Sequence, residues 1–377
     1  MKTRLCIDCS PLLVRSAGVK TWLANWVEAL RLDGRAEIHT LLEPAGRELI
    51  LQSTPASNAG RLFLLQAFRA LPAIAVGLAS GKTDVFHASN LIRKVPPRRL
   101  ATATLHDLTA WRVPQFHKRE QVRADMDFAR CILARADGVI AVSENSKRDA
   151  VEILRLNPEK IHVIYPGVAE EFFLVTQDET RTALAAVGIR RPYFLLNATI
   201  EPRKNIGAAL DAWNLLPPSV RSEVNLIVAG MVGWNCRGLL ERIQSMDREG
   251  TGVRYVGFVS ARHLPGLTRG AIAMLYPSFY EGFGLPVAQA MACGCPVITS
   301  NSSSLPEVTA GAALLVDPHS PGEIAAAMQN VLTSEELRGK LRADGKSRAN
   351  QYRWKRAADE SVRFFAAVVG RVPPNSA

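Results

Sequence analysis

The stretch Pro277–Pro306 reads PSFYEGFGLPVAQAMACGCPVITSNSSSLP, and it is the most informative part of this sequence. Pro286 stands where a helix is expected to begin and Gly294 where it is expected to end, because Pro favours the first helical turn and Gly the position just past the last. The apolar run Val297–Thr299 then predicts a short buried strand. A loop, a helix and a buried strand in this order are typical of an α/β domain.

The loop before this helix has the composition of a phosphate site. Glu281 precedes Gly282-Phe283-Gly284, and the following helix presents free backbone N–H groups beside the positive end of its dipole. The carboxylate of Glu281 can accept hydrogen bonds from hydroxyl groups of whatever the phosphate carries. The same residues also suit an ordinary loop–helix–strand unit, since a single glycine loop is a weak indication of function.

Strands and helices alternate along the chain, which predicts parallel sheets covered by helices on both faces. The first predicted strands are Leu5–Asp8, Val85–His87, Ala101–Leu105, Gly138–Val142 and Ile161–Ile164. The second series is Tyr193–Asn197, Asn225–Ala229, Val253–Val256, Ile272–Tyr276, Val297–Thr299 and Ala312–Val316. The predicted helices include Lys20–Leu32, Arg119–Ala136, Ser146–Leu154, Ile206–Leu216, Arg237–Arg248, Leu264–Arg269, Leu285–Ala292 and Pro321–Leu332. We therefore expect an α/β protein with two facing doubly wound domains and ligands at the carboxyl ends of strands near the cleft.

The chain has 377 residues, which is long enough for two domains. We predict an N-terminal Rossmann-like domain at 1–170 and a C-terminal Rossmann-like domain at 171–355. The connection is expected in the turn-rich and polar region 165–181. Residues 356–377 are expected to form a helix that packs back on the N-terminal domain, followed by a frayed tail.

The chain carries a net charge of +11, and more than half of the excess lies in residues 1–170. Such a basic surface is either simply solvated or suits an anionic ligand or an anionic membrane surface. Nucleic acid is not an expected partner, because the sequence contains no Lys/Arg-rich arm, zinc pattern or aromatic RNA motif. No secretory signal or membrane span is expected, and Leu62–Ala79 is predicted to be an amphipathic helix.

Polar residues directly follow several predicted strands, where α/β folds place their chemistry. His106 follows one strand, whereas Arg203 and Lys204 lie just before a helix that has Asn205 at its expected N-cap. Two cations near a helix N-terminus suit a diphosphate, although they also suit a solvated turn. His87 is also placed after a strand, but a single histidine there is more often structural than catalytic.

Three other site classes are disfavoured by spacing. The turn after the first strand contains only Gly18 and lacks G-x-G-x-x-G, which argues against a nicotinamide dehydrogenase. The segment Gly77–Thr83 resembles a P-loop but is one residue short and precedes a strand. The cysteines and the His, Asp and Glu residues show no metal spacing, so no metal is expected and the cysteines indicate a reducing compartment.

Together these motifs resemble glycosyltransferase family 4, whose members are retaining enzymes with the GT-B fold. The resemblance covers nearly the whole chain. It rests on motifs in the family's order and spacing, namely Thr104–Leu108, Val142–Lys147, Tyr165–Val168, Glu201–Asn205, Val256–Val259, Glu281–Pro286, Ala290–Ala292, Pro296-Val297 and Pro306–Val308. The variants at Glu201–Asn205 and Tyr276–Pro286 resemble mannosyltransferases of bacterial surface-polysaccharide assembly. The resemblance implies a nucleotide diphosphate sugar as donor substrate and no cofactor. It also implies that the domain at 1–170 is the acceptor side and that the domain at 171–355 binds the nucleotide sugar.

The resemblance also implies roles for particular residues. Glu281 is expected to hold hydroxyl groups of the donor sugar, and Lys204, with Arg203 beside it, to neutralise the departing diphosphate. His106 is expected beside the reacting sugar, and Gly18 is expected to keep the first loop close to the donor. Further donor contacts are expected from the backbone around Phe283, Gly284 and Leu285, from the backbone near Val259, and from Thr199 and Gln289.

Two positions depart from the family pattern. The E-x7-E segment that begins at Glu281 ends in Gln289, where relatives carry a second glutamate that binds the ribose hydroxyls. We therefore expect nucleotide binding to be weaker by about 1–2 kcal/mol. Ala198-Thr199 occupies a region where many relatives place an arginine, so Arg203 is the expected substitute.

The sequence thus predicts a retaining glycosyltransferase that moves a hexose, with mannose from GDP-mannose preferred. Its expected acceptor is a glycan or a polyprenyl-diphosphate-linked glycan in surface polysaccharide biosynthesis. The expected location is cytoplasmic, in peripheral contact with an anionic membrane at the inner face. A catalytically silent nucleotide-sugar-binding or interaction protein of the same fold is the main alternative, favoured by Gln289. A GT-B-like epimerase or phosphorylase is a further one.

Overall fold

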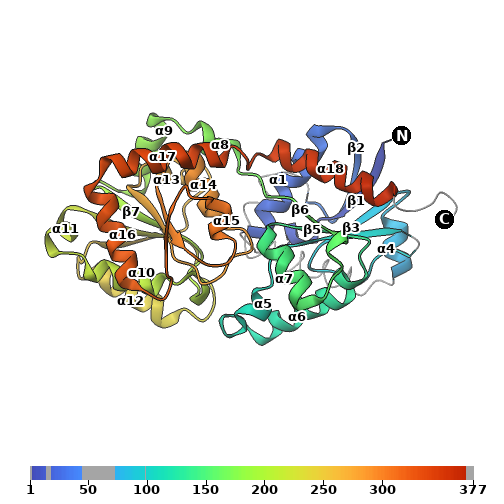
Figure 1. Ribbon diagram of the computed structural model, residues 1–377, viewed down its shortest axis with the longest axis horizontal. Helices are drawn as coiled ribbons and strands as arrows, with labels where there is room; N and C mark the ends of the chain where they lie inside the picture. Colours follow the sequence, from blue (N-terminus) through green and yellow to red (C-terminus); the bar gives the residue numbers. More distant parts are fainter. Residues whose placement is uncertain (1, 14–17, 45–72, 98, 371–377) are drawn as a thin grey trace. The chain divides into compact units, whose positions relative to one another are not determined.

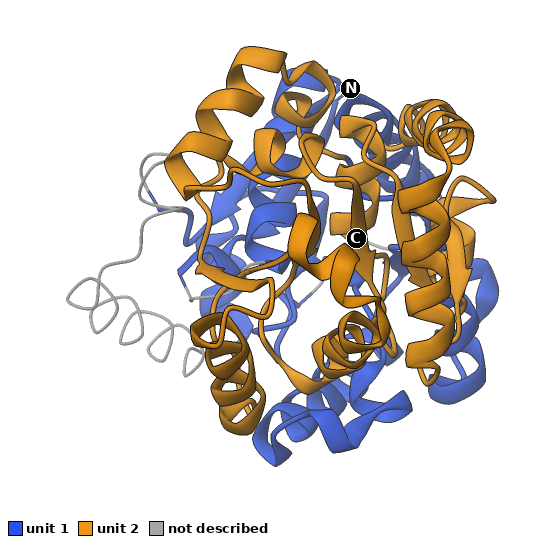
Figure 2. Cartoon of the chain, turned by 90° about the vertical axis from the view of Figure 1, so that its left-hand side faces the viewer, with its two compact units in different colours: residues 1–167, 354–377 blue, residues 168–353 orange. Residues whose placement is uncertain are grey.

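The computed structural model describes residues 2–13, 18–44, 73–97 and 99–370 (Figure 1). Two compact units are present: unit 1 comprises Met1–Gly167 and Trp354–Ala377, and unit 2 comprises Val168–Arg353 (Figure 2). The chain therefore crosses between the units twice, at Gly167 and at Arg353, which lie a few residues before the predicted boundaries at 170 and 355. The predicted amphipathic helix falls partly outside the described residues, and its described part is α4 (Ala73–Ala79).

Unit 1 contains a parallel sheet of six strands in the order β2-β1-β3-β4-β5-β6. Its strands are β1 (Thr3–Asp8), β2 (Ala36–Leu41), β3 (Val85–Ala88), β4 (Leu100–Leu105), β5 (Gly138–Ala141) and β6 (Ile161–Val163). The predicted strands of this domain are confirmed within a residue or two, but β2 was not predicted. It is an edge strand that alternates polar and apolar residues and is only partly buried, so it lacks the continuous apolar run of its neighbours.

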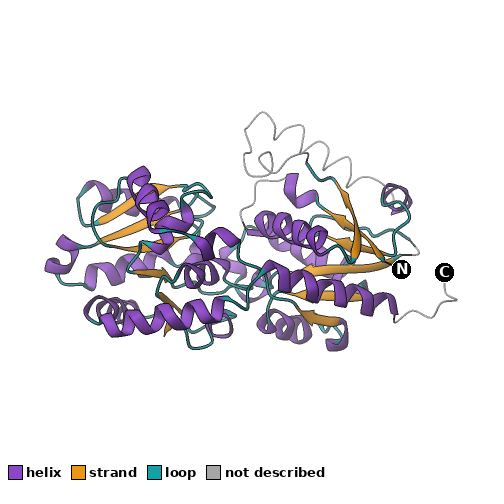
Figure 3. Ribbon diagram, turned by 90° about the horizontal axis from the view of Figure 1, so that it is seen from above, coloured by secondary structure: helices purple, strands orange, loops and turns teal. Residues whose placement is uncertain are grey.

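Helices cover both faces of this sheet (Figure 3). On one face α1 (Gly18–Asp33) packs against α18 (Trp354–Gly370), and the indole N–H of Trp26 donates to the Ser361 hydroxyl at 2.9 Å. The helix near the C-terminus thus belongs to unit 1, although the whole of unit 2 separates it from that unit in sequence. The other face carries α5 (Thr109–Arg112), α6 (Arg119–Cys131) and α7 (Glu144–Leu154).

Unit 2 contains a second six-stranded parallel sheet, in the order β12-β11-β10-β7-β8-β9. Its strands are β7 (Tyr193–Asn197), β8 (Asn225–Ala229), β9 (Val253–Gly257), β10 (Ala273–Tyr276), β11 (Val297–Ser300) and β12 (Leu314–Val316). Its helices are α8 (Glu170–Leu174), α9 (Gln177–Val187), α10 (Ile206–Leu215), α11 (Pro218–Glu223), α12 (Arg237–Arg248), α13 (Leu264–Arg269), α14 (Leu285–Cys293), α15 (Leu305–Thr309), α16 (Pro321–Thr333) and α17 (Glu335–Ala349). All six strands predicted here are confirmed.

The polar segment Thr176–Arg181, predicted to be part of the connection, begins a helix instead. The Thr176 hydroxyl accepts from the Glu179 N–H, and the Glu179 carboxylate accepts from the Thr176 N–H, which together form a capping box. Polar side chains at this point therefore cap α9 and do not form a linker.

The strand order of unit 2 reverses between β7 and β10, which are neighbours in the sheet. The chain runs outward from β7 through β8 to β9 and then returns to β10 on the other side of β7. The loops that leave the carboxyl ends of β7 and β10 therefore diverge at one place, which is where open α/β sheets bind ligands.

Candidate functional site

The centre of the candidate site is a buried ion pair between Lys204 and Glu281. Lys204 ends a short 3-10 turn, Pro202–Lys204, after β7, and Glu281 lies in the loop after β10. The Lys204 Nζ lies 2.7 Å from Glu281 Oε1, and the two side chains are only 11% and 9% exposed. The sheet topology thus joins two residues that the sequence predicted separately, at the place where the strand order reverses.

Arg203 also belongs to this cluster, because it contacts Glu281 and Glu201. One of its terminal nitrogens lies 2.7 Å from Glu201 Oε1, and the other lies 3.0 Å from Glu281 Oε2 and donates to the Tyr280 carbonyl at 2.7 Å. The two carboxylates and two cations balance each other formally. Arg203 is therefore held by protein groups on both sides, which supports a role in orienting Glu281.

The charges of the cluster are set by its own members. Burial raises the pKa of the Glu281 carboxyl, but the charges of Arg203 and Lys204 outweigh this effect and bring the pKa down to about 2. Burial also lowers the pKa of Lys204, with a further contribution from Arg203, while Glu281 and Glu201 oppose the decrease. Glu281 is therefore ionised at neutral pH.

A loop of serines fixes the segment that carries Glu281. The Ser303 hydroxyl accepts from the Glu281 N–H at 2.9 Å, and the Ser304 hydroxyl donates to the Glu281 carbonyl at 3.0 Å. The Ser302 and Ser300 hydroxyls donate to the carbonyls of the segment just before it, at 3.1 and 2.6 Å. This role was not predicted, because nothing in a run of serines shows which backbone groups their hydroxyls will reach.

Asn205 occupies the N-cap position of α10 as predicted, but its side chain does not cap the helix. Its amide nitrogen donates to the carbonyls of Pro277 and Pro318, at 3.0 and 2.7 Å, and its backbone has a φ of 54°. The predicted N-cap position is therefore confirmed, but the Asn205 side chain makes no capping hydrogen bond. Asn205 ties the turn after β7 to the segment after β10, because Asn tolerates the left-handed conformation better than other non-glycine residues.

The glycine loop leads into α14 in the predicted manner. Gly284 has a φ of 91°, and a Cβ atom there would lie 2.6 Å from the Leu305 side chain. Pro at the start of α14 and Gly294 in the left-handed conformation at its end are confirmed. Phe283 is buried with its ring against Tyr352, so only its backbone faces the loop, and Leu285 begins the helix. The N-terminus of α14 is thus beside Glu281.

The other predicted donor contacts are distributed over unit 2. Gln289 lies on α14, the helix that follows Glu281, and is partly buried. Thr199 lies between β7 and the turn that carries Lys204, and Val259 follows β9. Next to Val259, the ring of Phe258 is 67% exposed. Phe258 was not among the predicted site residues, although it lies in the motif Val256–Val259, and its exposure at the end of a strand makes it a candidate contact.

In unit 1, His106 directly follows β4 and is held by aromatic packing. The Trp22 ring meets the imidazole edge-on, with centroids 4.6 Å apart, and Trp22 stacks on Trp26 at 4.9 Å. Burial lowers the pKa of His106 to about 4, although Asp107 opposes this effect. His106 is therefore neutral at physiological pH.

His87 has the structural role that was expected. Its ring nitrogens each lie 3.0 Å from a threonine hydroxyl, those of Thr102 and Thr104, and Trp26 and Phe365 pack on it. Gly18, the other predicted residue of unit 1, is exposed and begins α1, and a Cβ there would meet nothing within 4 Å. Among the described residues, none therefore requires glycine at this position.

Asp8 lies at the switch point of unit 1, where the strand order reverses between β1 and β3. It ends β1, and it accepts hydrogen bonds from the Ser10 N–H at 3.0 Å, from the Ser10 hydroxyl at 2.9 Å and from the Ser89 hydroxyl, which follows β3. Burial raises the pKa of this carboxyl, and the hydrogen bonds oppose that effect. The Asp8 carboxylate therefore links the loop after β1 to the loop after β3.

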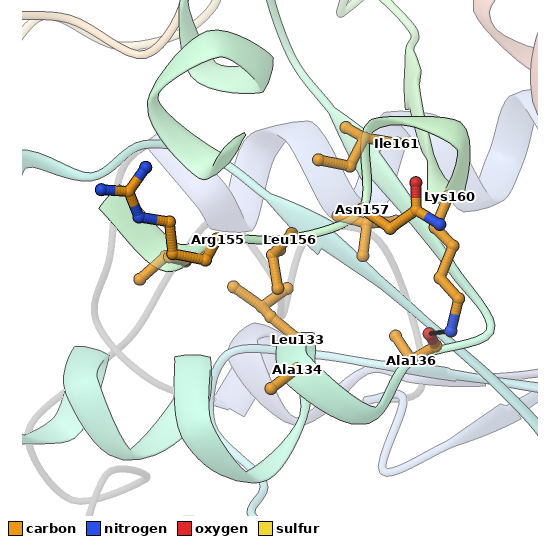
Figure 4. A pocket seen from close by; sticks show the side chains of 10 residues that line it. Leu133, Ala134, Ala136, Arg155, Leu156, Asn157, Lys160 and Ile161 are labelled. Atoms are coloured by element: carbon orange, nitrogen blue, oxygen red, sulfur yellow. Dashed lines mark hydrogen bonds between the residues drawn. The ribbon is translucent and has the colours of Figure 1, made fainter. Parts of the chain in front are cut away.

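A cavity of about 180 Å³ lies elsewhere in unit 1, at the amino ends of β5 and β6 (Figure 4). Leu133, Leu156 and Ile161 line it, with Arg155 and Lys160 also present, and the Lys160 ammonium donates to the Ala136 carbonyl at 3.3 Å. His106 follows the carboxyl end of β4, so this cavity is not part of its surroundings.

Metal ligands and membrane spans can be considered for the described residues. No group of three or more His, Cys, Asp or Glu side chains among them is placed to hold a metal ion. Within the same ranges, no helix has the length and apolar character needed to cross a membrane.

Comparisons with known proteins cover nearly the whole chain. A family model described as Glycosyltransferase Family 4 matches residues 17–172, and one described as Glycosyl transferases group 1 matches residues 184–348. The chain is 32% identical over 323 residues to O-antigen chain mannosyltransferase B of Escherichia coli, which covers 82% of this chain and 84% of that protein.

Two more similarities differ in what they cover. The serotype-specific mannosyltransferase WbdA of Escherichia coli is 27% identical over 303 residues, which is 78% of this chain but only 36% of that longer protein. The crystal structure of Alr3699/HepE of Anabaena, in complex with UDP and glucose, matches with a TM-score of 0.73 and 17% identity. That match covers 97% of this chain and all of the other, and it concerns the fold alone.

Proposed function

Because the chain belongs to glycosyltransferase family 4, we propose that it transfers mannose, with retention, from GDP-mannose to a growing surface polysaccharide. The family, the GT-B fold and glycosyltransferase activity in polysaccharide biosynthesis are confirmed by the comparisons. Mannose as the sugar is supported by the names of the most similar relatives, which are mannosyltransferases. GDP as the nucleotide remains our proposal.

The observation that carries this function is the Lys204–Glu281 pair at the switch point of unit 2. Glu281 is ionised and buried, so its carboxylate is a strong acceptor for hydroxyl groups of the donor sugar. Lys204 and the N-terminus of α14 lie on either side of it in the chain, and both favour an anionic group. A sugar diphosphate has the hydroxyl groups and the negative charge that this arrangement suits.

In the proposed reaction the bond between the sugar C1 and the diphosphate oxygen breaks, and a bond from C1 to the acceptor oxygen forms on the same face. The acceptor hydroxyl gives its proton to an oxygen of the departing diphosphate, so no protein nucleophile is required. Lys204 stabilises the charge that develops on the diphosphate. His106, which is neutral, is proposed to accept a hydrogen bond from the sugar.

For the nucleotide we propose two contacts after β9. The exposed ring of Phe258 offers a face on which a base can stack, and the backbone near Val259 offers hydrogen-bonding groups. Gln289, on α14, is proposed to bind the ribose with its amide in place of a carboxylate. We thus propose that the protein binds the nucleotide, but more weakly than it would with a glutamate at position 289.

A polyprenyl-diphosphate-linked glycan is the proposed acceptor, and a cytoplasmic position in contact with the inner membrane face is proposed with it. The net charge of +11, most of it in residues 1–170, supports contact with anionic lipid. A cofactor-free reaction is likewise proposed, since positive charge from Lys204 can replace a cation at the diphosphate.

The second candidate is a catalytically silent protein that binds nucleotide sugars, and Gln289 favours it. The test is a thermal-shift series with GDP, UDP, ADP and dTDP, followed by product analysis with GDP-mannose and a lipid-linked acceptor. We expect GDP to raise the melting temperature most, since a ligand of the native state stabilises it. Binding without transfer or hydrolysis would support the silent protein, and preference for another nucleotide would overturn GDP-mannose.

A further inference from the structure

The phenol of Tyr276 lies against the same ammonium group as Glu281. Tyr276 ends β10, and its hydroxyl accepts a hydrogen bond from Lys204 Nζ at 2.8 Å, while Glu281 Oε1 accepts a second at 2.7 Å. The ammonium also lies 5.2 Å from the centroid of the phenol ring. Lys204 thus has two hydrogen-bond acceptors, one at the end of β10 and one in the loop after it.

An ammonium group has three N–H bonds, and these two acceptors take two of them. The direction of the third N–H is then set by the other two, since the three are arranged tetrahedrally about nitrogen. Without the phenol, Nζ would be free to turn about its bond to Cε and to follow Glu281 alone. The phenol therefore converts a flexible cation into a directed one.

Tyr276 is itself firmly placed. Its side chain is almost fully buried, and its strand pairs with β7 on one side and with β11 on the other. Its carbonyl accepts from the Thr299 hydroxyl at 2.8 Å. Burial raises its pKa well above the ordinary value, so the hydroxyl stays protonated and neutral.

We propose that Tyr276 is a positioning residue that directs the remaining N–H of Lys204 toward the departing diphosphate. This inference rests on the proposed function and adds to it a residue that acts through Lys204. An ammonium donates a stronger hydrogen bond to the hydroxyl oxygen than a neutral amine does, so the phenol also favours the protonated form of Lys204, whose pKa burial lowers.

The other charged or titratable groups that face Lys204 come from the same two loops. They are Arg203, which disfavours the ammonium, and Glu201 and Glu281, which favour it. The change Tyr276→Phe leaves all of these in place and keeps the ring and its packing. It removes only the hydroxyl, which accepts from Lys204 and donates to the Glu281 carboxylate, while Glu281 keeps its contacts with Arg203 and Lys204. Its effect on this ion pair can therefore be separated from a general loss of structure.

Tyr193 provides a matched control. It is another buried tyrosine of the same sheet, in β7, and its hydroxyl donates to the Leu267 carbonyl at 2.5 Å. Tyr193→Phe therefore also removes one buried hydrogen bond from a strand tyrosine, but it does not touch Lys204. A loss of activity that came from reduced stability alone would appear in both variants.

The first experiment measures transfer from GDP-mannose as a function of pH for the wild type, Tyr276→Phe and Tyr193→Phe. We expect Tyr276→Phe to lower kcat about ten- to a hundredfold, the size of one hydrogen bond to a charged group, with little change in KM for the donor. The alkaline limb of its pH profile should move to lower pH, because the buried ammonium has lost an acceptor. Equal profiles for Tyr276→Phe and Tyr193→Phe would overturn the proposal.

The second experiment needs no substrate. Protein labelled with [ε-13C]lysine is titrated by NMR, and the Lys204 resonance is identified by its loss in Lys204→Met. We expect the pKa of Lys204 to be lower in Tyr276→Phe than in the wild type and unchanged in Tyr193→Phe. Titration of Lys204 at one pH in all three proteins would overturn the inference, whereas a wild type without transfer activity would overturn only the proposed function.

Discussion

Asn205 donates from one amide group to the carbonyls of Pro277 and Pro318, which follow β10 and β12, and so joins the Lys204 turn to two other strand ends. The Pro277 contact spans the strands whose order reverses in the sheet of unit 2. The spacing between Lys204 and Glu281 thus depends on a residue that contacts neither of their charged groups.

Replacement of Asn205 is therefore expected to destabilise unit 2. Asn205→Ala should lose both hydrogen bonds and place Ala at a φ of 54°, at a cost of about 2–4 kcal/mol. Asn205→Gly should lose the same bonds without the backbone strain, so its melting temperature should lie between those of Asn205→Ala and the wild type. Equal melting temperatures for all three proteins would show that the two bonds are not needed.

Replacement of Glu281 is expected to abolish transfer. Glu281→Gln keeps the shape of the side chain but leaves Arg203 and Lys204 without their shared carboxylate, so the melting temperature should also fall. Glu281→Ala should have the same effect on transfer with the protein still folded. Glu335→Gln, at an exposed carboxylate that pairs with Arg338 and Arg342, serves as the control and should keep both properties. Transfer by Glu281→Ala at the wild-type rate would mean that the site lies elsewhere.

Gln289→Glu is expected to strengthen nucleotide binding. A carboxylate accepts hydrogen bonds from ribose hydroxyls more strongly than an amide oxygen does, so GDP should bind about ten times more tightly, which corresponds to about 1.4 kcal/mol. Titration calorimetry with GDP measures this directly. An equal or weaker affinity would contradict the assignment of Gln289 to the ribose.

Gly284→Ala is expected to disturb the loop that leads into α14. The glycine has a φ of 91°, and the added Cβ would lie 2.6 Å from the Leu305 side chain, so both strain and crowding result. We expect a loss of about 2 kcal/mol or more in unfolding free energy, measured by chemical denaturation, together with lower transfer. Gly238→Ala in α12 is the control, because its Cβ would meet nothing and alanine favours a helix.

The buried histidine of unit 1 gives a pH prediction. Burial, with a smaller effect from His106, lowers the pKa of His87 to about 3, compared with an ordinary value of 6.5. As the pH falls from 6.5, the unfolded chain takes up a proton at His87 and the folded protein does not, so stability is lost on the acid side. The unfolding free energy of the wild type relative to His87→Gln should therefore fall by about 1.4 kcal/mol per pH unit down to pH 4. A difference that does not change with pH would contradict a neutral His87.

Much of the fold was predictable because its signal is local. Most strands other than β2 are short apolar runs that lie largely buried between layers of helices, so composition alone marks them, whereas β6, β9 and β12 are only partly buried. The edge strand β2 has no such run, and α9 begins with polar caps that resemble a linker. The elements β2 and α9 were not predicted, because the burial of a residue depends on the segments that pack on it, and these cannot be read from the local sequence.

The residue types of the site can be read from the chain alone: Glu281 before a glycine loop, the cations Arg203 and Lys204 before a helix, and Gln289 in place of a glutamate. The partners of these residues follow from the folded arrangement and could not be predicted. The fold placed Arg203 on Glu201 and Glu281, turned Asn205 away from its helix, and put the Tyr276 hydroxyl on Lys204. These contacts join residues far apart in the chain, and they form because parallel strands bring their carboxyl ends to one edge of a sheet.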